Sequence, residues 1–418
     1  MRIKKINSIN KLLVFTVVLL LVLSAFLAGC GSKQSSESNK PAESEQATDS
    51  GKSDSNQSSS ESSDDVIRIG VYEPMTGASA AGGQMTVEGI NLANEMFPEV
   101  LGKKIKLFLV DNKTDKTEAA NAVSRLIQQN KVSVIIGSYG SSLSMAGGQV
   151  AKDAKVPVVG CSPTNPLVTL NNDYYFRVCF IDPFQGKVMA KYAFNTLKAK
   201  KAAIIMDVSN DYSVGLSNYF KQAFVELTGD KNAIVAEAKY KTGDQEFTAQ
   251  LTGIKDLNPD VIFAPGNYGE SALLIKQARD LGIKAPFLGG DTYEAPEFIQ
   301  IGGQAVEGVA FSTHYTAEAP VTEVSKQFLD AYKQKYGKDP TAFAALGFDA
   351  YLVARDAIER AGSAEPQAIR DALAKTQDFK GATGIITLDE NGDANKSAVI
   401  KQVKDGKFVY VETIQPDK

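Results

Sequence analysis

The sequence predicts an α/β protein with two doubly wound lobes, each built on a parallel sheet covered by helices. From residue 66 onward, short apolar runs alternate with amphipathic helical segments, and the alternation begins again after about residue 182. The length of 418 residues suits two lobes of ordinary size better than one small domain. We therefore expect ligand-facing loops at the carboxyl ends of the strands in both lobes.

The first thirty residues differ from this pattern and read as a targeting segment. A basic stretch, 1–11, precedes an apolar run, 12–27, that has the length of a signal-peptide core and is short for a membrane span of about 20 residues. The run closes on Leu-Ala-Gly-Cys, which resembles the lipobox of bacterial lipoproteins. That resemblance implies removal of residues 1–29 and a lipid on Cys30, which anchors an extracytoplasmic protein to the bacterial cell membrane. The residues alone also allow an uncleaved N-terminal anchor.

Residues 31–65 are dominated by serine and scattered charged or amide side chains, without aromatic or β-branched apolar residues. Such a segment cannot bury enough apolar surface to offset its chain entropy. Together with Cys30 it is predicted to be a disordered tether.

The predicted elements of the two βα series follow in chain order. In the first series we expect strands at 66–71, 104–110, 132–136 and 156–159, and helices at 83–97, at 116–129 and from about 141. In the second series we expect strands at 202–206, 233–239, 261–263 and 286–288, and helices at 184–197, 213–226, 245–257 and 270–281. Two long helices, 322–336 and 343–361, precede a β-rich tail, 384–414.

Composition and motifs argue against several classes of function. The formal net charge of −4, from 45 basic and 49 acidic residues, gives no reason to expect a nucleic-acid partner. The one histidine, His314, cannot build a multi-histidine metal site and leaves few options for catalysis. The usual hydrolase, metalloprotease, phosphate-loop and dinucleotide motifs are absent. We therefore expect no enzyme, no catalytic residue, no metal and no organic cofactor. Cys161 and Cys179 follow neighbouring strands, and their pairing is left open.

Two loops at predicted strand ends carry polar residues. The run 135–142 passes from a buried strand through Gly-Ser-Tyr-Gly to the start of a helix, where Ser141 or Ser142 is a natural N-cap. The same arrangement of free N–H groups and a hydroxyl can bind a carboxylate, so the two readings are compatible. After the next strand, two prolines within 162–166 fix a loop whose carbonyls can point outward.

Nearly everything from residue 67 onward resembles the leucine/isoleucine/valine-binding family of ABC-importer binding proteins, which has the type I periplasmic-binding fold. The matching pieces are 69–77, Gly137 with Ser141-Ser142, the Ser-Pro-Thr-Asn-Pro loop at 162–166, 176–177 with 182–186, and 381–384 with 389–393. The resemblance implies two lobes joined by a hinge that the chain crosses three times. The first lobe is expected to contain 66–182 and 316–387, and the second 183–315 and 388–418.

The resemblance also implies a binding site for an amino acid. In the family a hydroxyl at the position of Ser141 holds the ligand carboxylate, and the loop residues Ser162 and Thr164 meet the ammonium group. Asp291 from the second lobe completes the ammonium site, and Tyr212 closes over the ligand. From the residues alone, Asp291 also fits a turn or cap, and Tyr212 also fits simple packing at a helix start.

The side-chain pocket departs from that of the family's aliphatic binders. Gly82 stands where a bulky aromatic residue is common, and Tyr139 introduces an aromatic ring elsewhere. Tyr268 and Phe343 are further pocket candidates, although helix packing suits them equally. The class of ligand is therefore better defined than its identity.

The partners implied by the resemblance are a branched-chain or similar amino acid and an ABC permease with its ATPase. The ligand favours the closed form, because only there do the two lobes' binding residues meet. Alternatives are a sensory lipoprotein with the same cleft, and a binder of urea, short amides or aromatic acids.

Overall fold

The computed structural model describes residues 66–416. The predicted signal peptide, the lipidation of Cys30 and the Ser-rich tether lie outside these residues and stay predictions. Across residues 66–416, none of the helices combines the length and apolar character that a membrane span requires.

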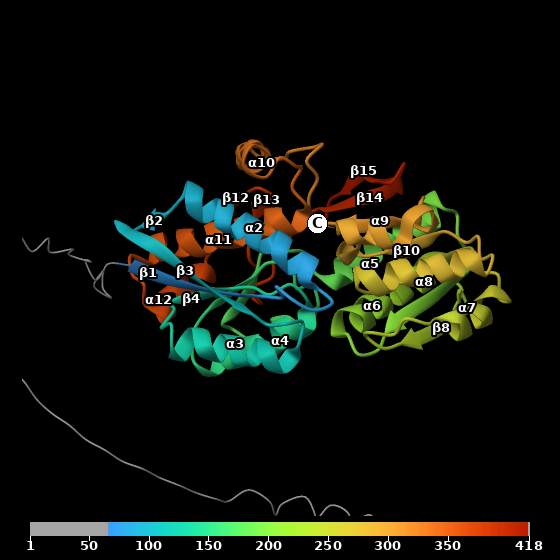
Figure 1. Ribbon diagram of the computed structural model, residues 1–418, viewed down its shortest axis with the longest axis horizontal. Helices are drawn as coiled ribbons and strands as arrows, with labels where there is room; N and C mark the ends of the chain where they lie inside the picture. The colour runs from blue at the N-terminus through green and yellow to red at the C-terminus, as the bar shows by residue number, and fades with distance from the viewer. Residues whose placement is uncertain (1–65, 417–418) are drawn as a thin grey trace, which may run out of the picture. The chain divides into compact units, whose positions relative to one another are not determined.

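The first lobe is built on a six-stranded sheet with the order β2-β3-β1-β4-β5-β6 (Figure 1). Its strands are β1 (Val66–Glu73), β2 (Glu99–Val100), β3 (Lys103–Asp111), β4 (Val134–Ile136), β5 (Val158–Gly160) and β6 (Tyr175–Arg177). All neighbours run parallel except β2, which pairs antiparallel with β3. Strands β4, β5 and β6 are buried along their length because helices cover both faces of the sheet.

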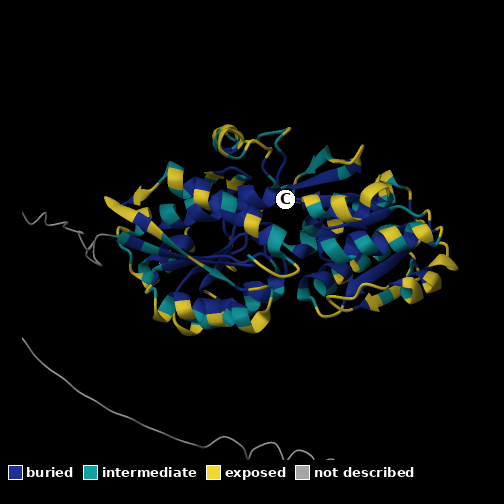
Figure 2. Ribbon diagram, viewed as in Figure 1, coloured by how far each residue is buried: buried dark blue, intermediate teal, exposed yellow. Residues whose placement is uncertain are grey.

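Two helices cover each face of this sheet. Helices α2 (Ala80–Met96) and α11 (Ala342–Ala361) pack together on one face, and α3 (Lys116–Gln128) and α4 (Ser141–Asp153) on the other. Figure 2 shows the strands buried beneath helices whose outer faces are exposed. Helices α10 (Glu323–Tyr336) and α12 (Pro366–Leu373) complete the lobe.

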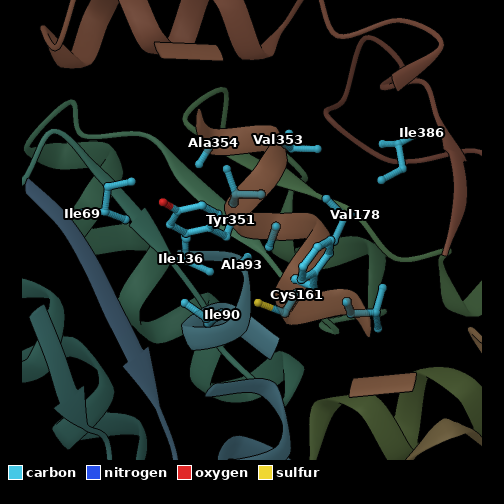
Figure 3. Packing of buried hydrophobic residues seen from close by; sticks show 14 of the residues in the cluster. Ile69, Ile90, Ala93, Ile136, Cys161, Val178, Tyr351, Val353, Ala354 and Ile386 are labelled. Atoms are coloured by element: carbon cyan, nitrogen blue, oxygen red, sulfur yellow. The ribbon is translucent and has the colours of Figure 1, made fainter. Parts of the chain in front are cut away.

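The core between the sheet and the α2–α11 pair is dense and apolar. Figure 3 shows Ile69 and Ile136 of the sheet beside Ile90 and Ala93 of α2 and Tyr351 of α11. The close helix approach depends on glycine, because a Cβ on Gly89 of α2 would lie 1.8 Å from the carbonyl oxygen of Ala344. The alanine-rich sequence of α11 provides the matching shallow surface.

The second lobe is built on a seven-stranded sheet with the order β15-β14-β11-β10-β9-β7-β8. Its strands are β7 (Ala202–Asp207), β8 (Ile234–Tyr240), β9 (Val261–Phe263), β10 (Phe287–Gly289), β11 (Ala310–Thr313), β14 (Ala398–Lys404) and β15 (Lys407–Ile414). Strands β7 to β11 run parallel to one another. Strands β14 and β15 extend the sheet at one edge through antiparallel pairing. One face is covered by α5 (Asp182–Lys191) and α6 (Asp211–Thr228), and the other by α7 (Thr248–Lys255), α8 (Tyr268–Asp280) and α9 (Pro296–Gly302).

The chain passes between the two sheets three times. The crossings follow β6, β11 and the small hairpin of β12 (Phe379–Gly381) and β13 (Gly384–Ile386). The predicted α/β architecture with two doubly wound lobes is confirmed. The exact residue limits of the lobes stay a prediction, and Leu388 and Ala394, placed in the second lobe on sequence grounds, belong to the hydrophobic core of the first.

Several local predictions need correction. The helix expected at 184–197 is α5, which begins earlier and passes into a wider π-helical turn at Tyr192–Thr196. Strand β11 and helices α9 and α12 were not predicted, because each is only four to eight residues long, too short for a periodic pattern to establish an element. Cys161 and Cys179 are both buried and remain free thiols.

Candidate amino-acid-binding site

A cavity of about 40 Å³ lies where the carboxyl ends of the two sheets meet. Each lobe contributes five lining residues, which follow β1, β4 and β5 in the first lobe and β7, β9 and β10 in the second. The lining residues are Ser79, Tyr139, Gly140, Ser141, Ser162, Asn210, Tyr212, Asn267, Asp291 and Thr292. Larger hollows of about 450 and 440 Å³ lie elsewhere, and neither contains a residue of the predicted site.

The N-terminus of α4 forms one wall of the cavity. The N-cap is Gly140, whose φ of 90° suits glycine, and no side chain caps the helix. The prediction that Ser141 or Ser142 is the N-cap is therefore wrong. The hydroxyl oxygen of Ser141 instead accepts a hydrogen bond from the backbone N–H of Asn165 over 3.1 Å. Its own proton stays free to be donated to a ligand, beside first-turn N–H groups that no side chain accepts from.

The loop before α4 is hydrogen-bonded to the buried side chain of Glu73. Glu73, at the end of β1, is fully buried and accepts a hydrogen bond from the backbone N–H of Tyr139 over 2.7 Å. Its other carboxyl oxygen has no hydrogen-bond partner in the described structure. Burial raises the pKa of Glu73 to about 8, because removal from water disfavours the charged form. A neutral carboxyl group thus supports the position of Tyr139 at neutral pH.

The side chain of Arg177 holds the loop at 162–166 through hydrogen bonds to its backbone. This fully buried guanidinium group donates to the carbonyl oxygens of Pro163 and Asn165 over 2.7 and 2.8 Å, and it pairs with Asp393 over 2.6 Å. The carbonyl oxygens of Pro163 and Asn165 therefore accept from Arg177, and neither residue lines the cavity. This anchoring fixes the path of the loop at the end of β5.

The hydroxyls of Ser162 and Thr164 are buried and have no partner in the described structure. Ser162 lines the cavity, whereas Thr164 does not. Asp182, at the start of α5, is also fully buried, and neither of its carboxyl oxygens has a hydrogen-bond partner. Its burial, with a smaller contribution from the charge of Asp291, raises the pKa of Asp182 to about 8. Polar groups that lack partners thus gather on this side of the cleft.

Asp291 is the centre of a hydrogen-bond network in the second lobe. Its Oδ1 accepts from the hydroxyl of Tyr212 over 2.8 Å and from the amide of Gln185 over 2.9 Å. Its Oδ2 lies 3.2 Å from Nε2 of His314, whose ring stacks on Phe180 at a centroid distance of 3.8 Å. These contacts hold the carboxylate in one orientation at the cavity wall.

Tyr139 forms another part of the cavity wall. A Cβ on Gly82 would lie 2.3 Å from Cε2 of this ring, so the tyrosine fills the space that a side chain at position 82 would need. Phe343 packs edge-on against Tyr139 at 4.9 Å, and the hydroxyl of Tyr268 accepts from the backbone N–H of Ala81 over 3.2 Å. Tyr268 and Phe343 surround Tyr139 in a hydrophobic cluster and do not line the cavity.

Hydrogen bonds and an ion pair join the two lobes beside the cavity. The hydroxyl of Ser142 donates to Oδ2 of Asp211 over 2.7 Å, and the backbone N–H of Asp211 donates back to that hydroxyl over 3.1 Å. Lys116 pairs with the same carboxylate over 3.0 Å, and Asn165 donates to the carbonyl oxygen of Asp211 over 2.7 Å. These bonds hold the loop at the start of α6 against the first lobe.

Comparison with known proteins gives the family. Residues 66–407 match the family model described as periplasmic binding protein. The chain is 30% identical to the Leu/Ile/Val-binding protein homolog 3 of Brucella melitensis over 83% of this chain and 94% of the relative. It belongs to the periplasmic binding proteins of the Leu/Ile/Val-binding type. Such proteins bind solutes outside the cytoplasm.

Solved structures agree with this assignment. The binding protein is 48% identical to the leucine-binding protein LivK of Thermotoga maritima, covering 84% of this chain and 99% of the other with a TM-score of 0.81. It is 33% identical to LivJ of Streptococcus pneumoniae, a branched-chain amino acid transporter substrate-binding protein solved with isoleucine, covering 84% and 100% of the two chains with a TM-score of 0.79. The type I periplasmic-binding fold is therefore confirmed.

The structure of the binding protein brings five of the predicted residues to one cavity. They are Tyr139, Ser141, Ser162, Tyr212 and Asp291. The supporting roles of Glu73, Gln185 and His314 at the site were not predicted, although Gln185 lies in the stretch 182–186 that matches the family. Among residues 66–416, no cluster of His, Cys, Asp and Glu side chains could hold a metal ion.

Proposed function

We propose that the binding protein captures an α-amino acid in this cavity and delivers it to an ABC importer, while a lipid on Cys30 holds it at the membrane. One observation carries the proposal. The cavity places hydrogen-bond donors of the first lobe opposite a fixed carboxylate of the second, which is the charge pattern of an amino-acid zwitterion.

The donors suit the ligand carboxylate. Ser141 offers a hydroxyl proton, and the N-terminus of α4 adds backbone N–H groups and the positive end of the helix dipole. The unpartnered hydroxyl of Ser162 is a second observation that favours a polar ligand here. Binding would satisfy groups that otherwise stay buried without a partner.

The acids suit the ligand ammonium group. Asp291 lines the cavity, and its orientation is held by Tyr212 and Gln185. Asp182 and Thr164 lie close behind this wall, and a positive charge nearby would favour the ionised form of Asp182. An ammonium group therefore offsets its desolvation through a paired negative charge. A ligand without a cation, such as urea, a short amide or an aromatic acid, would leave Asp291 uncompensated.

Delivery to a permease is supported by the relatives and by the contacts between the two lobes. LivJ of S. pneumoniae is described as a transporter substrate-binding protein, and its structure contains isoleucine. Asp211 in the second lobe bonds to Ser142 and Lys116 in the first, so closure joins both lobes into one surface. A sensory lipoprotein would use the same cleft, and uptake of labelled ligand by cells with and without the protein separates the two roles.

The test of ligand class is thermal unfolding of the chain from residue 31 onward against the twenty amino acids, urea, short amides and benzoate. At about 1 mM ligand and a Kd of about 1 μM, linkage predicts about 4 kcal/mol of stabilisation. Stabilisation by certain amino acids supports the proposal. Stabilisation by amides or benzoate alone would replace the amino acid with an uncharged or anionic ligand. Conversion of a stabilising ligand into a product would show an enzyme instead.

A further inference from the structure

We infer that Glu294 is a positioning residue, which ties the turn carrying Asp291 to the first lobe and so fixes the distance between the two charged ends of the site. That distance sets a preference for α-amino acids over isomers that carry the amino group on the β-carbon. The inference rests on the proposed function and deepens it.

Glu294 ends the short turn that begins at Asp291. Its backbone N–H donates to the carbonyl oxygen of Asp291 over 3.0 Å, and its buried side chain accepts at Oε2 from the hydroxyl of Thr313 over 2.5 Å. The next residue, His314, contacts the carboxylate of Asp291. Two consecutive residues at the end of β11 therefore hold the two acids of this turn in place.

The same side chain reaches the first lobe. Oε1 of Glu294 accepts from the backbone N–H of Ala342, the first residue of α11, over 2.9 Å. The first N–H groups of a helix have no acceptor within the helix and lie at its positive end, so a carboxylate suits this position. Helix α11 packs against β4 and β5, and the loops after those strands carry Ser141 and Ser162. Glu294 thus connects the turn of Asp291 to the scaffold of the carboxylate end.

Close packing does not replace this bond. Glu294 and Lys401 of β14 border a hollow of about 450 Å³ that residues of both lobes line. Nζ of Lys401 lies 2.9 Å from Oε1 of Glu294, so the buried charge is paired within the second lobe. Because an open hollow adjoins the bond, the turn and α11 have room to separate once the bond is lost.

A second link between the lobes lies at their other edge, where Ser142 bonds to Asp211. In Figure 1, α4 and α6 lie along the lower edge of the two lobes and β14 along the upper edge. Links at both edges hold Ser141 and Asp291 at one separation. An α-amino acid has one carbon between its carboxylate and its amino group, whereas a β-isomer has two and needs a wider site.

The experiment is calorimetric titration of the chain from residue 31 onward with leucine, alanine and their β-amino isomers, 3-amino-4-methylpentanoic acid and β-alanine. The unaltered protein should prefer the α-isomers. Two double variants, Lys401→Met with Glu294→Gln and Lys401→Met with Glu294→Leu, both avoid an unpaired buried charge. Only the first keeps an acceptor for Ala342. The glutamine variant should retain the preference for the α-isomers, and the leucine variant should lose at least fivefold of it.

A control acts at the same end of α11. Thr341→Ala removes the cap bond to the backbone N–H of Ala344 within the first lobe and leaves the bond of Glu294 in place. It should lower stability without changing the ratio of α-isomer to β-isomer affinity. If the leucine double variant does not fold, Glu294→Asp, whose carboxylate is one carbon shorter, takes its place.

Two outcomes overturn the inference. A merely structural role of residue 294 would weaken both isomers of a pair by the same factor, and that result leaves the proposed function standing. An unaltered protein that binds neither leucine nor alanine, or that prefers neither α-isomer, also overturns it. The thermal screen against all twenty amino acids then decides the proposed function separately.

Discussion

The hydroxyl of Ser142 in the first lobe lies 2.7 Å from the carboxylate of Asp211 in the second. These residues lie in the first turns of two different helices, α4 and α6, so this hydrogen bond joins the two lobes. Burial raises the pKa of Asp211, but the hydrogen bonds and charge from Ser142 and Lys116 outweigh it and hold the pKa below its ordinary value. The carboxylate is therefore ionised at neutral pH, and its bonds to Ser142 and Lys116 stabilise the closed form. We call these contacts of Asp211 the latch.

Removal of the latch should shift the lobes toward the open form. In Asp211→Ala we expect ligand affinity to fall by about 1 kcal/mol, because the bonds to Ser142 and Lys116 are lost at a half-exposed site. Small-angle X-ray scattering should show a larger radius of gyration for the unliganded variant than for the unliganded, unaltered protein. The control is Glu237→Gln, which breaks an exposed pair with Lys221 within the second lobe. Equal affinity for Asp211→Ala and the unaltered protein would disprove the latch.

The two ends of the proposed zwitterion site can be tested separately. Ser141→Ala and Asp291→Asn should each weaken amino-acid binding by about 1–3 kcal/mol, because each removes a partner of a buried charged group. Titration calorimetry provides the measurement. Ser325→Ala, which alters the N-terminal cap of α10 and does not touch the cavity lining, should leave affinity unchanged. Unchanged affinity in both site variants would contradict the assignment of the site.

The buried acid beneath Tyr139 should make stability depend on pH. The pKa of Glu73 is raised from 4.5 to about 8 by burial, so the folded state holds its proton more tightly than the unfolded chain. The resulting stability is fully present below about pH 4.5 and is lost as the pH rises through about 8.

In Glu73→Gln this loss should disappear, since the amide cannot ionise. We compare the free energy of unfolding of the variant with that of the unaltered protein at two pH values. Between pH 5 and pH 9 the difference should shift in favour of the variant by on the order of a few kcal/mol. Urea unfolding at both pH values measures this change. Parallel pH profiles for the two proteins would argue that Glu73 is ionised in the folded state.

The crossing of α2 and α11 should not tolerate a methyl group at Gly89. A Cβ there would lie 1.8 Å from the carbonyl oxygen of Ala344, so Gly89→Ala should destabilise the protein by about 1–3 kcal/mol despite the better helix propensity of alanine. The matched control is Gly253→Ala in α7, where an added Cβ would meet no atom within 4 Å outside the neighbouring residues and the helix's own backbone. The free energy of unfolding of that variant, measured with urea, should rise by up to about 1 kcal/mol. A stabilised Gly89→Ala would show that the two helices can separate without loss.

The lipid anchor predicted from the sequence has a direct test. Cys30→Ser removes the thiol that would carry the lipid, so the protein should leave the membrane fraction and appear in the soluble fraction. A fractionated immunoblot makes the comparison. Retention in the membrane fraction would favour an uncleaved N-terminal anchor.

Much of the architecture could be read from local pattern. Strands such as β4 and β5 are short apolar runs because both faces of a parallel sheet are covered, and that burial leaves a clear signal in the sequence. Amphipathic spacing likewise marked α3 and α8 close to their observed limits. Since parallel strands place their carboxyl ends on one edge, the loops at those ends were predicted to face the cleft, and the resemblance to the Leu/Ile/Val-binding family assigned Ser141 and Asp291 to the ligand.

The tertiary structure decided the relationships that depend on contacts distant in sequence. Gln185 and His314 meet at Asp291 from different elements, and no local periodicity marks either of them. The left-handed backbone of Gly140, rather than a serine, caps α4 because the preceding loop must turn sharply into the helix. Gly82 and Tyr139 are 57 positions apart, yet one fills the space that the other leaves. Sequence pattern records which face of an element is buried, whereas the packing of the two lobes determines which side chains share a cavity and how much room they leave.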